Sequence, residues 1–273
     1  MKPTLVVLAA GMGSRYGKLK QMDEFGPNGE TIIDYSIYDA IQAGFGKVVF
    51  IVREYFLEEF KSLMDPKFQD KIDLVYVTQE LSKIPEGIDV HPDREKPWGT
   101  AHAVWVAKDV VNEPFAVINA DDFYGADSYK VLTDYLTKDK TDNYAVVAYY
   151  LRNTLSDHGT VNRGVCYSDE DNHLTKVVEC TKVQRESDGI VRYPNGGNGK
   201  NILEDGTLVS MNMWAFRPSY FTHVENQFVD FLKKRGKELK SEFYIPTVVD
   251  KLINDGELVV DVLDTDSSWF GVT

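Results

Sequence analysis

The sequence predicts an α/β fold, a three-layer α/β/α sandwich around a mostly parallel, Rossmann-like central sheet. Two observations support this prediction. Over residues 1–150, short apolar runs alternate with segments whose apolar residues recur at helical spacing. This repeated strand–helix–strand rhythm favours parallel strands joined by crossover helices. The chain has 273 residues, 43% of them hydrophobic, which is enough to bury one large core.

The first half opens with a buried strand over Thr4–Ala9. After a loop, Ile33 and Ile37 mark one face of a helix that Gly44 should end. The remaining elements of this half are strands over Lys47–Val52, Asp73–Thr78, Phe115–Asn119 and Asn143–Tyr150, and helices over Glu54–Met64, Gly99–Ala107 and Ser128–Leu136. We expect Pro66 to stop the second of the four helices.

After Leu151 the rhythm changes to strands without intervening helices. The expected elements are strands over Gly164–Ser168, Leu174–Glu179, Leu208–Phe216 and Leu258–Leu263, and helices over Tyr220–Arg235 and Phe243–Asp255. The glycine- and asparagine-rich stretch Tyr193–Lys200 predicts a loop. No linker or repeat interrupts the chain, so we expect one α/β domain over residues 1–273 with two halves, 1–150 and 151–273.

Composition narrows the classes of function. The formal net charge of −13 predicts repulsion of DNA and RNA, so we expect no nucleic-acid partner. The two cysteines are too few for a disulfide framework and have no zinc-site spacing. No stretch approaches the ~20 apolar residues that a membrane helix needs. We expect a cytoplasmic enzyme without a membrane partner.

The loop that follows the first strand is the strongest functional signal. Glycines let the backbone approach a ligand and direct N–H groups at phosphate oxygens, and an arginine can bind those oxygens in a fork. The candidates are Ala10, Gly11, Gly13, Ser14, Arg15 and, further along, Lys20. The loop matches neither the dinucleotide-binding fingerprint nor the Walker A motif, because residues that each motif requires are missing. An ordinary strand-to-loop turn with a solvated Arg15 is the alternative.

This loop, followed by Lys20-Gln21, resembles the signature of the nucleotidyltransferase superfamily that makes nucleotide sugars. The superfamily includes sugar-1-phosphate uridylyl- and thymidylyltransferases and, more distantly, cytidylyltransferases. The resemblance extends with gaps over nearly the whole chain. It implies that Gly11, Gly13 and Arg15 surround a nucleoside triphosphate and that Lys20 contacts the phosphates near the reacting centre. Residues 1–150 would then form a nucleotide-binding half, and residues 151–273 an acceptor-binding half.

The resemblance also implies a base site and a metal site. Gln79 and the helix start at Gly99 and Thr100 match the positions that recognise the base, and an amide suits a pyrimidine edge. We expect His102, one step inside that helix, to be structural. Asp121 matches the position that holds Mg²⁺, at the carboxyl end of a strand where α/β sheets bind ligands. Asp122 suits a helix N-cap better.

On the acceptor side, the resemblance implies that Gly164, Glu179 and Asn212 contact the sugar. Two departures stand out. Cys180 occupies the place of a lysine that would reach the acceptor phosphate, for which Lys176 or Lys182 could substitute. Gly271 replaces a second magnesium aspartate, so we expect the second ligand to be absent or to come from Asp264 or Asp266. The resemblance also predicts a further C-terminal segment beyond Thr273.

The predicted function is transfer of a nucleoside monophosphate from a nucleoside triphosphate to a sugar 1-phosphate, with Mg²⁺ as cofactor and Arg15, Lys20 and Asp121 as catalytic residues. Three alternatives stay open. A cytidylyltransferase for a non-sugar phosphate is the nearest, and a glycosyltransferase is disfavoured because a donor with two phosphates needs no triphosphate loop. A catalytically inactive nucleotide-binding or sensing protein would account for Cys180 and Gly271.

Overall fold

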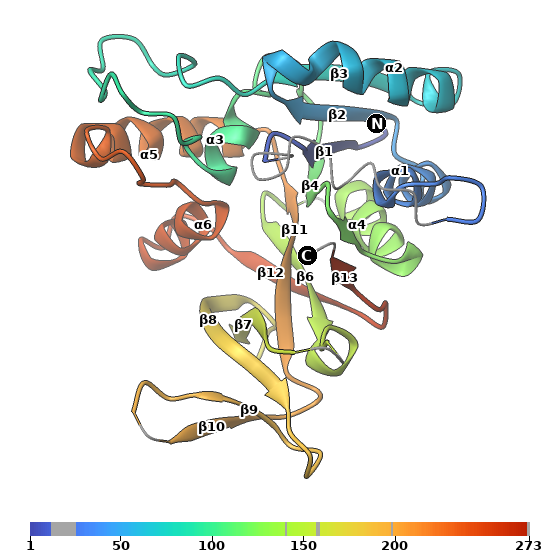
Figure 1. Cartoon of the computed structure of the whole chain (residues 1–273), viewed down its shortest axis with the longest axis vertical. Helices are drawn as coiled ribbons and strands as arrows, with labels where there is room; N and C mark the ends of the chain where they lie inside the picture. The colour runs from blue at the N-terminus through green and yellow to red at the C-terminus, as the bar shows by residue number, and fades with distance from the viewer. Residues whose placement is uncertain (12–25, 140, 157–158, 198, 272–273) are drawn as a thin grey trace.

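The computed structural model describes residues 1–11, 26–139, 141–156, 159–197 and 199–271. Its centre is a block of four parallel strands in the order β4-β1-β2-β3 (Figure 1). These strands are β1 (Thr4–Leu8), β2 (Lys47–Val52), β3 (Asp73–Thr78) and β4 (Phe115–Asn119). In this block Leu8 is in register with Ile51 and Asn119, so the carboxyl ends of β1, β2 and β4 form one level edge.

Two groups of helices cover the two faces of this block (Figure 1). One group consists of α1 (Ile32–Ala43), α2 (Leu57–Phe68) and α4 (Ala126–Lys138), and the other of α3 (Thr100–Trp105), α5 (Ser219–Arg235) and α6 (Ile245–Asn254). Leu5 and Val7 belong to the apolar core beneath the first group, while Val6 belongs to the core beneath the second. Because neighbouring residues of a strand face opposite sides, this division confirms the predicted three-layer α/β fold.

The second half adds strands to the same sheet. Strand β11 (Leu208–Phe216) runs antiparallel to β4, to β6 (Tyr144–Tyr150) and to β7 (Val161–Ser168), while β12 (Val260–Thr265) lies parallel to β6. Strands β8 (Leu174–Arg185), β9 (Val191–Pro194) and β10 (Lys200–Leu203) extend the sheet to the end farthest from β3 (Figure 1). A separate pair joins β5 (Asp122–Phe123) to β13 (Phe270–Gly271) near the end of the chain.

Two predictions about elements were wrong. Helix α2, preceded by a short 3₁₀ turn over Glu54–Phe56, continues past Pro66 to Phe68. Phe60, Met64 and Phe68 recur every four residues and are buried, so core packing holds the last turn although proline supplies no N–H. The loop predicted over residues 193–200 was too wide, because residues 193, 194 and 200 belong to β9 and β10, which pair as a hairpin across the turn.

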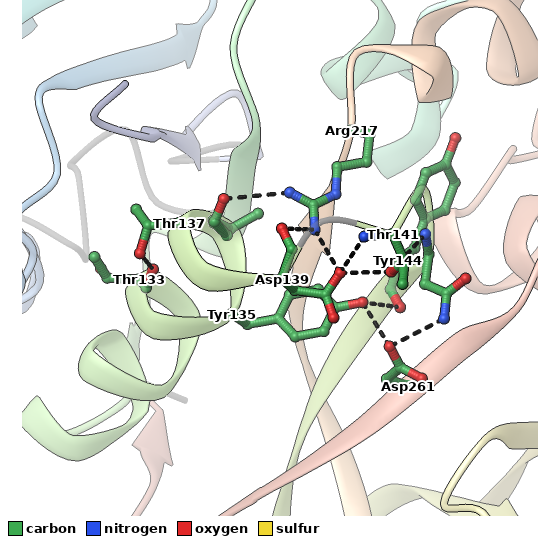
Figure 2. A network of polar contacts seen from close by, with 10 residues as sticks. Thr133, Tyr135, Thr137, Asp139, Thr141, Tyr144, Arg217 and Asp261 are labelled. Atoms are coloured by element: carbon green, nitrogen blue, oxygen red, sulfur yellow. Dashed lines mark hydrogen bonds and ion pairs between the residues drawn. The ribbon is translucent and has the colours of Figure 1, made fainter.

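Helix α4 is fastened to the end of β11 and to β12 by a partly buried polar network (Figure 2). Arg217, directly after β11, donates to the Leu136 carbonyl at 3.2 Å and to Asp139 at 3.4 Å, both at the end of α4. Tyr135 of α4 donates to Asp261 of β12 over 2.7 Å, and Arg217 lies 5.5 Å from the centre of the Tyr135 ring. The network therefore fixes the helix that follows the predicted metal-binding turn.

Candidate functional site

A cavity of about 510 Å³ opens at the carboxyl edge of the parallel block, and we call it the first cavity. The residues that line it are Leu8, Ala10, Gly11, Arg53, Tyr55, Gln79, Glu95, Lys96, Pro97, Gly99, Thr100, Ala103, Asn119, Asp121 and Glu242. This position follows from the topology, because the carboxyl ends of parallel strands and the loops that leave them meet at one edge. All described nucleotide-binding candidates, and Asp121, lie in this lining.

The chain reaches the first cavity through short, well-anchored connections. Gln79 directly follows β3, and its N–H donates to the Val52 carbonyl at 2.8 Å. Gly99 is the N-cap of α3 with a φ of +111°, and an added Cβ there would collide with the backbone of Phe243. Thr100 accepts a hydrogen bond from the N–H of Ile245 at 3.1 Å. The end of β3 and the start of α3, which both form part of the cavity wall, are thus held by contacts with the backbone of neighbouring segments. Only glycine fits at position 99.

The cations in the lining of the first cavity have acidic partners. Arg53 lies 3.3 Å from Glu80, and Lys96 is paired with Glu242. Sequence analysis missed Arg53, although it follows the carboxyl end of β2 and the topology rule could have found it. Gly13, Ser14, Arg15 and Lys20 lie outside the described residues, so their predicted roles stay predictions.

The two neighbouring aspartates have different surroundings. Asp121 lines the first cavity, whereas Asp122 is buried and accepts hydrogen bonds from Asn119 at 2.9 Å and Tyr124 at 3.2 Å. Burial, and then the nearby Asp121 charge, raise the pKa of Asp122 to about 7. The N-cap interpretation of Asp122 was wrong, because α4 starts at Ala126 and has Gly125 as its N-cap.

A second cavity, of about 650 Å³, lies against the antiparallel extension. Its lining consists of Thr100, Asn119, Gly164, Val177, Glu179, Ser210, Asn212, Tyr244, Pro246 and Thr247. It therefore contains all three residues predicted to bind the acceptor. Gly164 and Glu179 are direct partners across β7 and β8, and Ser210 of β11 pairs with Gly164 on the other side. Three adjacent strands thus supply one wall of the second cavity.

Asn119 and Thr100 line both cavities, so the two cavities are adjacent and share part of their walls. Asn212 donates to Asn119 Oδ1 at 2.7 Å, and Asn119 in turn donates to Asp122. Asn212 has a φ of +61° within an irregular stretch of β11, where its register with β6 shifts. Asn119 was missed by sequence analysis although it ends β4 two residues before Asp121. Its position at the carboxyl edge was the available signal.

Arg163, beside Gly164 in β7, is a second buried residue that the sequence did not single out. Its guanidinium donates to Thr154 and lies 4.6 Å from the centre of the Trp269 ring. Burial lowers the pKa of Arg163 to about 10, while the charges of Asp122 and Glu179 oppose that change. Arg163 therefore stays protonated at neutral pH and provides positive charge close to the two carboxylates.

The two aspartates suggested as a second magnesium ligand in place of Gly271 lie outside the linings of both cavities. Asp264 accepts a hydrogen bond from Tyr150 at 2.8 Å, and Asp266 lies 3.8 Å from Arg152. Neither residue is in the lining of a cavity. Gly271 is paired with Asp122, and an added Cβ there would lie 2.8 Å from Asp122 Oδ1. The position of the missing carboxylate is therefore packed directly against the Asp122 carboxylate.

The two lysines suggested as replacements for a lysine at position 180 also lie outside the second cavity. Val177 and Glu179 of β8 face the second cavity, so strand alternation directs Lys176 and Cys180 to the other face. The ammonium of Lys176 lies 4.7 Å from the centre of the Tyr167 ring. Lys182 has a φ of +56° and is exposed. Neither lysine lines the second cavity as described.

The donor set around Asp121 fits a magnesium ion. Within the described ranges, no three His, Cys, Asp or Glu side chains cluster as a metal site. Mg²⁺ needs no such cluster, since it binds one or two carboxylates and completes its shell with phosphate oxygens and water. Asp121 supplies a carboxylate within the first cavity, and Asn119 adds an amide oxygen nearby. These residues are suited to a metal that arrives with a phosphorylated ligand.

The model of the nucleotidyl transferase family matches residues 4–272, and the chain therefore belongs to that family. No curated protein matches the sequence. The inositol-1-phosphate CTP transferase from T. maritima is 14% identical with a TM-score of 0.63, over 99% of this chain and 89% of that one. The UDP-glucose pyrophosphorylase from Acinetobacter baumanii is 15% identical with a TM-score of 0.60, over 99% and 88%.

These likenesses extend along the whole chain and confirm the fold. Among the helices that the structure describes, none has the length and apolar character needed to cross a membrane. The family, the fold and the two adjacent cavities agree with an enzyme that brings a nucleotide and an acceptor together.

Proposed function

We propose that this member of the nucleotidyl transferase family transfers a nucleoside monophosphate from a nucleoside triphosphate to a sugar 1-phosphate. The single observation that carries the proposal is the wall that the two cavities share at Thr100 and Asn119. The nucleotide would occupy the first cavity, with its base at Gln79 and Gly99. The acceptor would occupy the second cavity, beside Gly164, Glu179 and Asn212. Their reacting phosphates would then meet near Asn119 and Asp121.

The chemistry would be an in-line displacement at the α-phosphorus. An oxygen of the acceptor phosphate forms the new bond to phosphorus, and the bond to the pyrophosphate oxygen breaks. A phosphate monoester is mostly dianionic at neutral pH, so it attacks without a general base. When bound, Mg²⁺ would neutralise charge on the phosphate oxygens. Arg15 and Lys20 would orient the triphosphate and stabilise the charge that develops on it.

The second cavity supports an acceptor with several hydroxyl groups. Burial raises the pKa of Glu179, while the Arg163 charge acts in the opposite direction. A carboxylate can accept hydrogen bonds from two hydroxyl groups of one ring. This chemistry fits a sugar 1-phosphate, and it equally fits an inositol phosphate, the acceptor in the name of one structural relative. A cytidylyl transfer to that cyclic polyol phosphate is therefore the second candidate.

The test is a pyrophosphate-release assay with ATP, CTP, GTP, UTP and dTTP against a panel of sugar 1-phosphates and inositol 1-phosphate. We expect release with one nucleotide and one acceptor to exceed every other pair by at least about 100-fold. Release only in the presence of inositol 1-phosphate would favour the second candidate. Tight nucleotide binding without release from any pair would instead identify a nucleotide-binding protein without transferase activity.

A further inference from the structure

Gln79 and His102 form a chain of hydrogen bonds between two backbone carbonyls at the wall of the first cavity. His102 in α3 is fully buried, and its Nε2 lies 2.7 Å from the carbonyl oxygen of Lys83. Its Nδ1 lies 3.0 Å from Nε2 of Gln79. The same Gln79 nitrogen lies 3.1 Å from the carbonyl oxygen of Gly99. This chain of hydrogen bonds therefore begins and ends on carbonyl oxygens, which can only accept hydrogen bonds.

The two end groups determine where each hydrogen lies. Because the Lys83 carbonyl cannot donate, the short contact requires a hydrogen on Nε2 of His102. Burial lowers the pKa of His102 to about 4, so the ring is neutral at pH 7 and its Nδ1 has a free lone pair. Gln79 must then donate one amide hydrogen to Nδ1 and the other to Gly99. Both hydrogens of the amide are used within the protein.

The amide oxygen of Gln79 is left as the polar atom of this side chain that the two contacts do not use. It accepts no hydrogen bond from any residue that the structure describes, and Gln79 lines the first cavity. Turning the amide by 180° would place this oxygen against Nδ1 of His102 and the Gly99 carbonyl, which are both acceptors. Two donor–acceptor contacts would become two repulsive ones, so the orientation is fixed.

We propose that His102 is a positioning residue that holds the Gln79 amide so that the first cavity offers a fixed hydrogen-bond acceptor to the base. This inference rests on the proposed function, in which the first cavity binds a nucleotide. A ring nitrogen that carries a hydrogen, as in uracil, thymine and guanine, satisfies this acceptor. Cytosine and adenine present a bare ring nitrogen, which repels this acceptor, and they can satisfy it only by turning the neighbouring amino group towards it. His102 thus sets the class of base without touching it.

The hydrogen positions can be measured directly by ¹⁵N NMR of the histidine rings in the full chain. A protonated ring nitrogen and a bare one resonate far apart, and a His102→Asn variant assigns the signal among the five histidines. We expect His102 to have a protonated Nε2 and a bare Nδ1 at pH 7. A protonated Nδ1, or a charged ring, would overturn the inference without reference to any activity.

Selectivity provides the second measurement, by calorimetric binding of nucleotides without acceptor. We expect UTP to bind about 100-fold more tightly than CTP, and GTP than ATP if purines bind. His102→Leu removes one of the two contacts that fix the amide and leaves only the Gly99 carbonyl, so this ratio should fall. His102→Asn is the matched control, since its side-chain oxygen can occupy the place of Nδ1 and should preserve the ratio.

The outcomes separate the two proposals. A preference for CTP over UTP, or an unchanged ratio in His102→Leu, would overturn the role of His102 even if the enzyme is fully active. Failure to release pyrophosphate with any acceptor would overturn the proposed function alone, because neither the NMR signal nor the binding ratio needs an acceptor. A bare Nδ1 together with a ratio lost only in His102→Leu would support the inference.

Discussion

Asp121 and Asp122 adjoin in sequence and differ in what surrounds them. Asp122 is enclosed by Asn119, Tyr124 and the backbone at Gly271, and its raised pKa follows from that enclosure. Of these two aspartates, only Asp121 is in the lining of the first cavity, which Glu95 and Glu242 also line. The same residue type thus serves two purposes, and only exposure to the cavity makes one of the pair suitable for a metal.

Asp121→Asn should raise the Mg²⁺ concentration needed for half-maximal activity and lower the maximal rate by about 100-fold. The amide keeps the shape of the side chain and removes the charge that binds the cation. Pyrophosphate release titrated with Mg²⁺ measures both effects. Asp264→Asn is the matched control, because Asp264 binds Tyr150 away from the cavities, and it should leave the titration unchanged. Equal titrations of Asp121→Asn and wild type would place the metal elsewhere.

The His102 ring should make the protein less stable in acid. Its folded pKa of about 4 lies below the ordinary histidine value of 6.5, so the unfolded chain binds more protons between these two pH values. The free energy of unfolding therefore falls as the pH drops from 6.5, by about 2 kcal/mol at pH 5. Urea unfolding of wild type and of His102→Asn at pH 6.5 and at pH 5 measures this contribution. The wild type should lose more stability than the variant, and equal losses would contradict burial of a neutral ring.

At the scale of elements, the start of α3 joins the proposed base site to α6. Gly99 has a backbone conformation that favours glycine, and the N–H of Ala101 donates to the Phe243 carbonyl at 3.1 Å. The first turn of α3, which carries Thr100 and His102, is therefore placed by the chain segment that precedes α6. A change at this junction should affect the base site through the backbone.

Gly99→Ala should destabilise the fold by about 3 kcal/mol and weaken nucleotide binding, because the new Cβ would overlap the backbone of Phe243. Gly87→Ala is the matched control. Gly87 also has a positive φ, +76°, and an added Cβ there meets nothing within 4 Å. That variant should show only the strain of its conformation, about 1 kcal/mol. Thermal unfolding and nucleotide titration of both variants give the comparison, and equal losses would argue against a close approach at Gly99.

Regular elements could be predicted from the sequence where local patterns and tertiary packing agree. The strands over Lys47–Val52, Asp73–Thr78, Phe115–Asn119 and Leu208–Phe216 have the predicted bounds, because each is a short apolar run between clear breaks. The continuation of α2 past Pro66 depends on the pocket that receives Phe68, and no local rule contains it. The β9–β10 hairpin depends on pairing across a polar turn, which composition describes only as a loop.

The candidate site divides in the same way. The carboxyl-edge rule and the family resemblance pointed to residues such as Gln79 and Asp121, and both of these residues line the first cavity. Asn119 was missed although its place at the carboxyl end of β4 was an available signal, whereas Arg163 was missed because its role depends on contacts with distant parts of the chain. Asn119 receives a hydrogen bond from Asn212 of β11, and Arg163 reaches Trp269 near the end of the chain. Such long-range partners have no signature in a single sequence.

At the scale of the whole molecule, charge and topology act together. The net charge of −13 opposes the approach of anionic ligands, so the proposed binding of two phosphorylated substrates would depend on local cations. Topology separates the substrates: the parallel block and its loops line the first cavity, while β7, β8 and β11 supply one wall of the second. The cavities meet only at the residues they share, so their binding energies should be largely independent.

Two variants test this independence. Glu179→Gln should raise the acceptor KM by about tenfold, because the charge-assisted hydrogen bonds to hydroxyl groups are lost, and it should leave nucleotide affinity unchanged. Gln79→Ala should reduce discrimination among nucleotides and leave the acceptor KM unchanged. Steady-state kinetics with each substrate varied in turn measures both.

The double variant completes the cycle. Since Gln79 and Glu179 line different cavities and no hydrogen bond or ion pair joins them in the described part of the chain, the two effects on kcat/KM should multiply, within about twofold. Asn119→Ala, at the junction, is the informative contrast, because Asn119 contacts Asp122 and Asn212 and lines both cavities. It should affect both substrates at once and lower kcat more than either other variant. A strong coupling between Gln79 and Glu179 would mean that the two cavities form a single site whose halves cannot be changed separately.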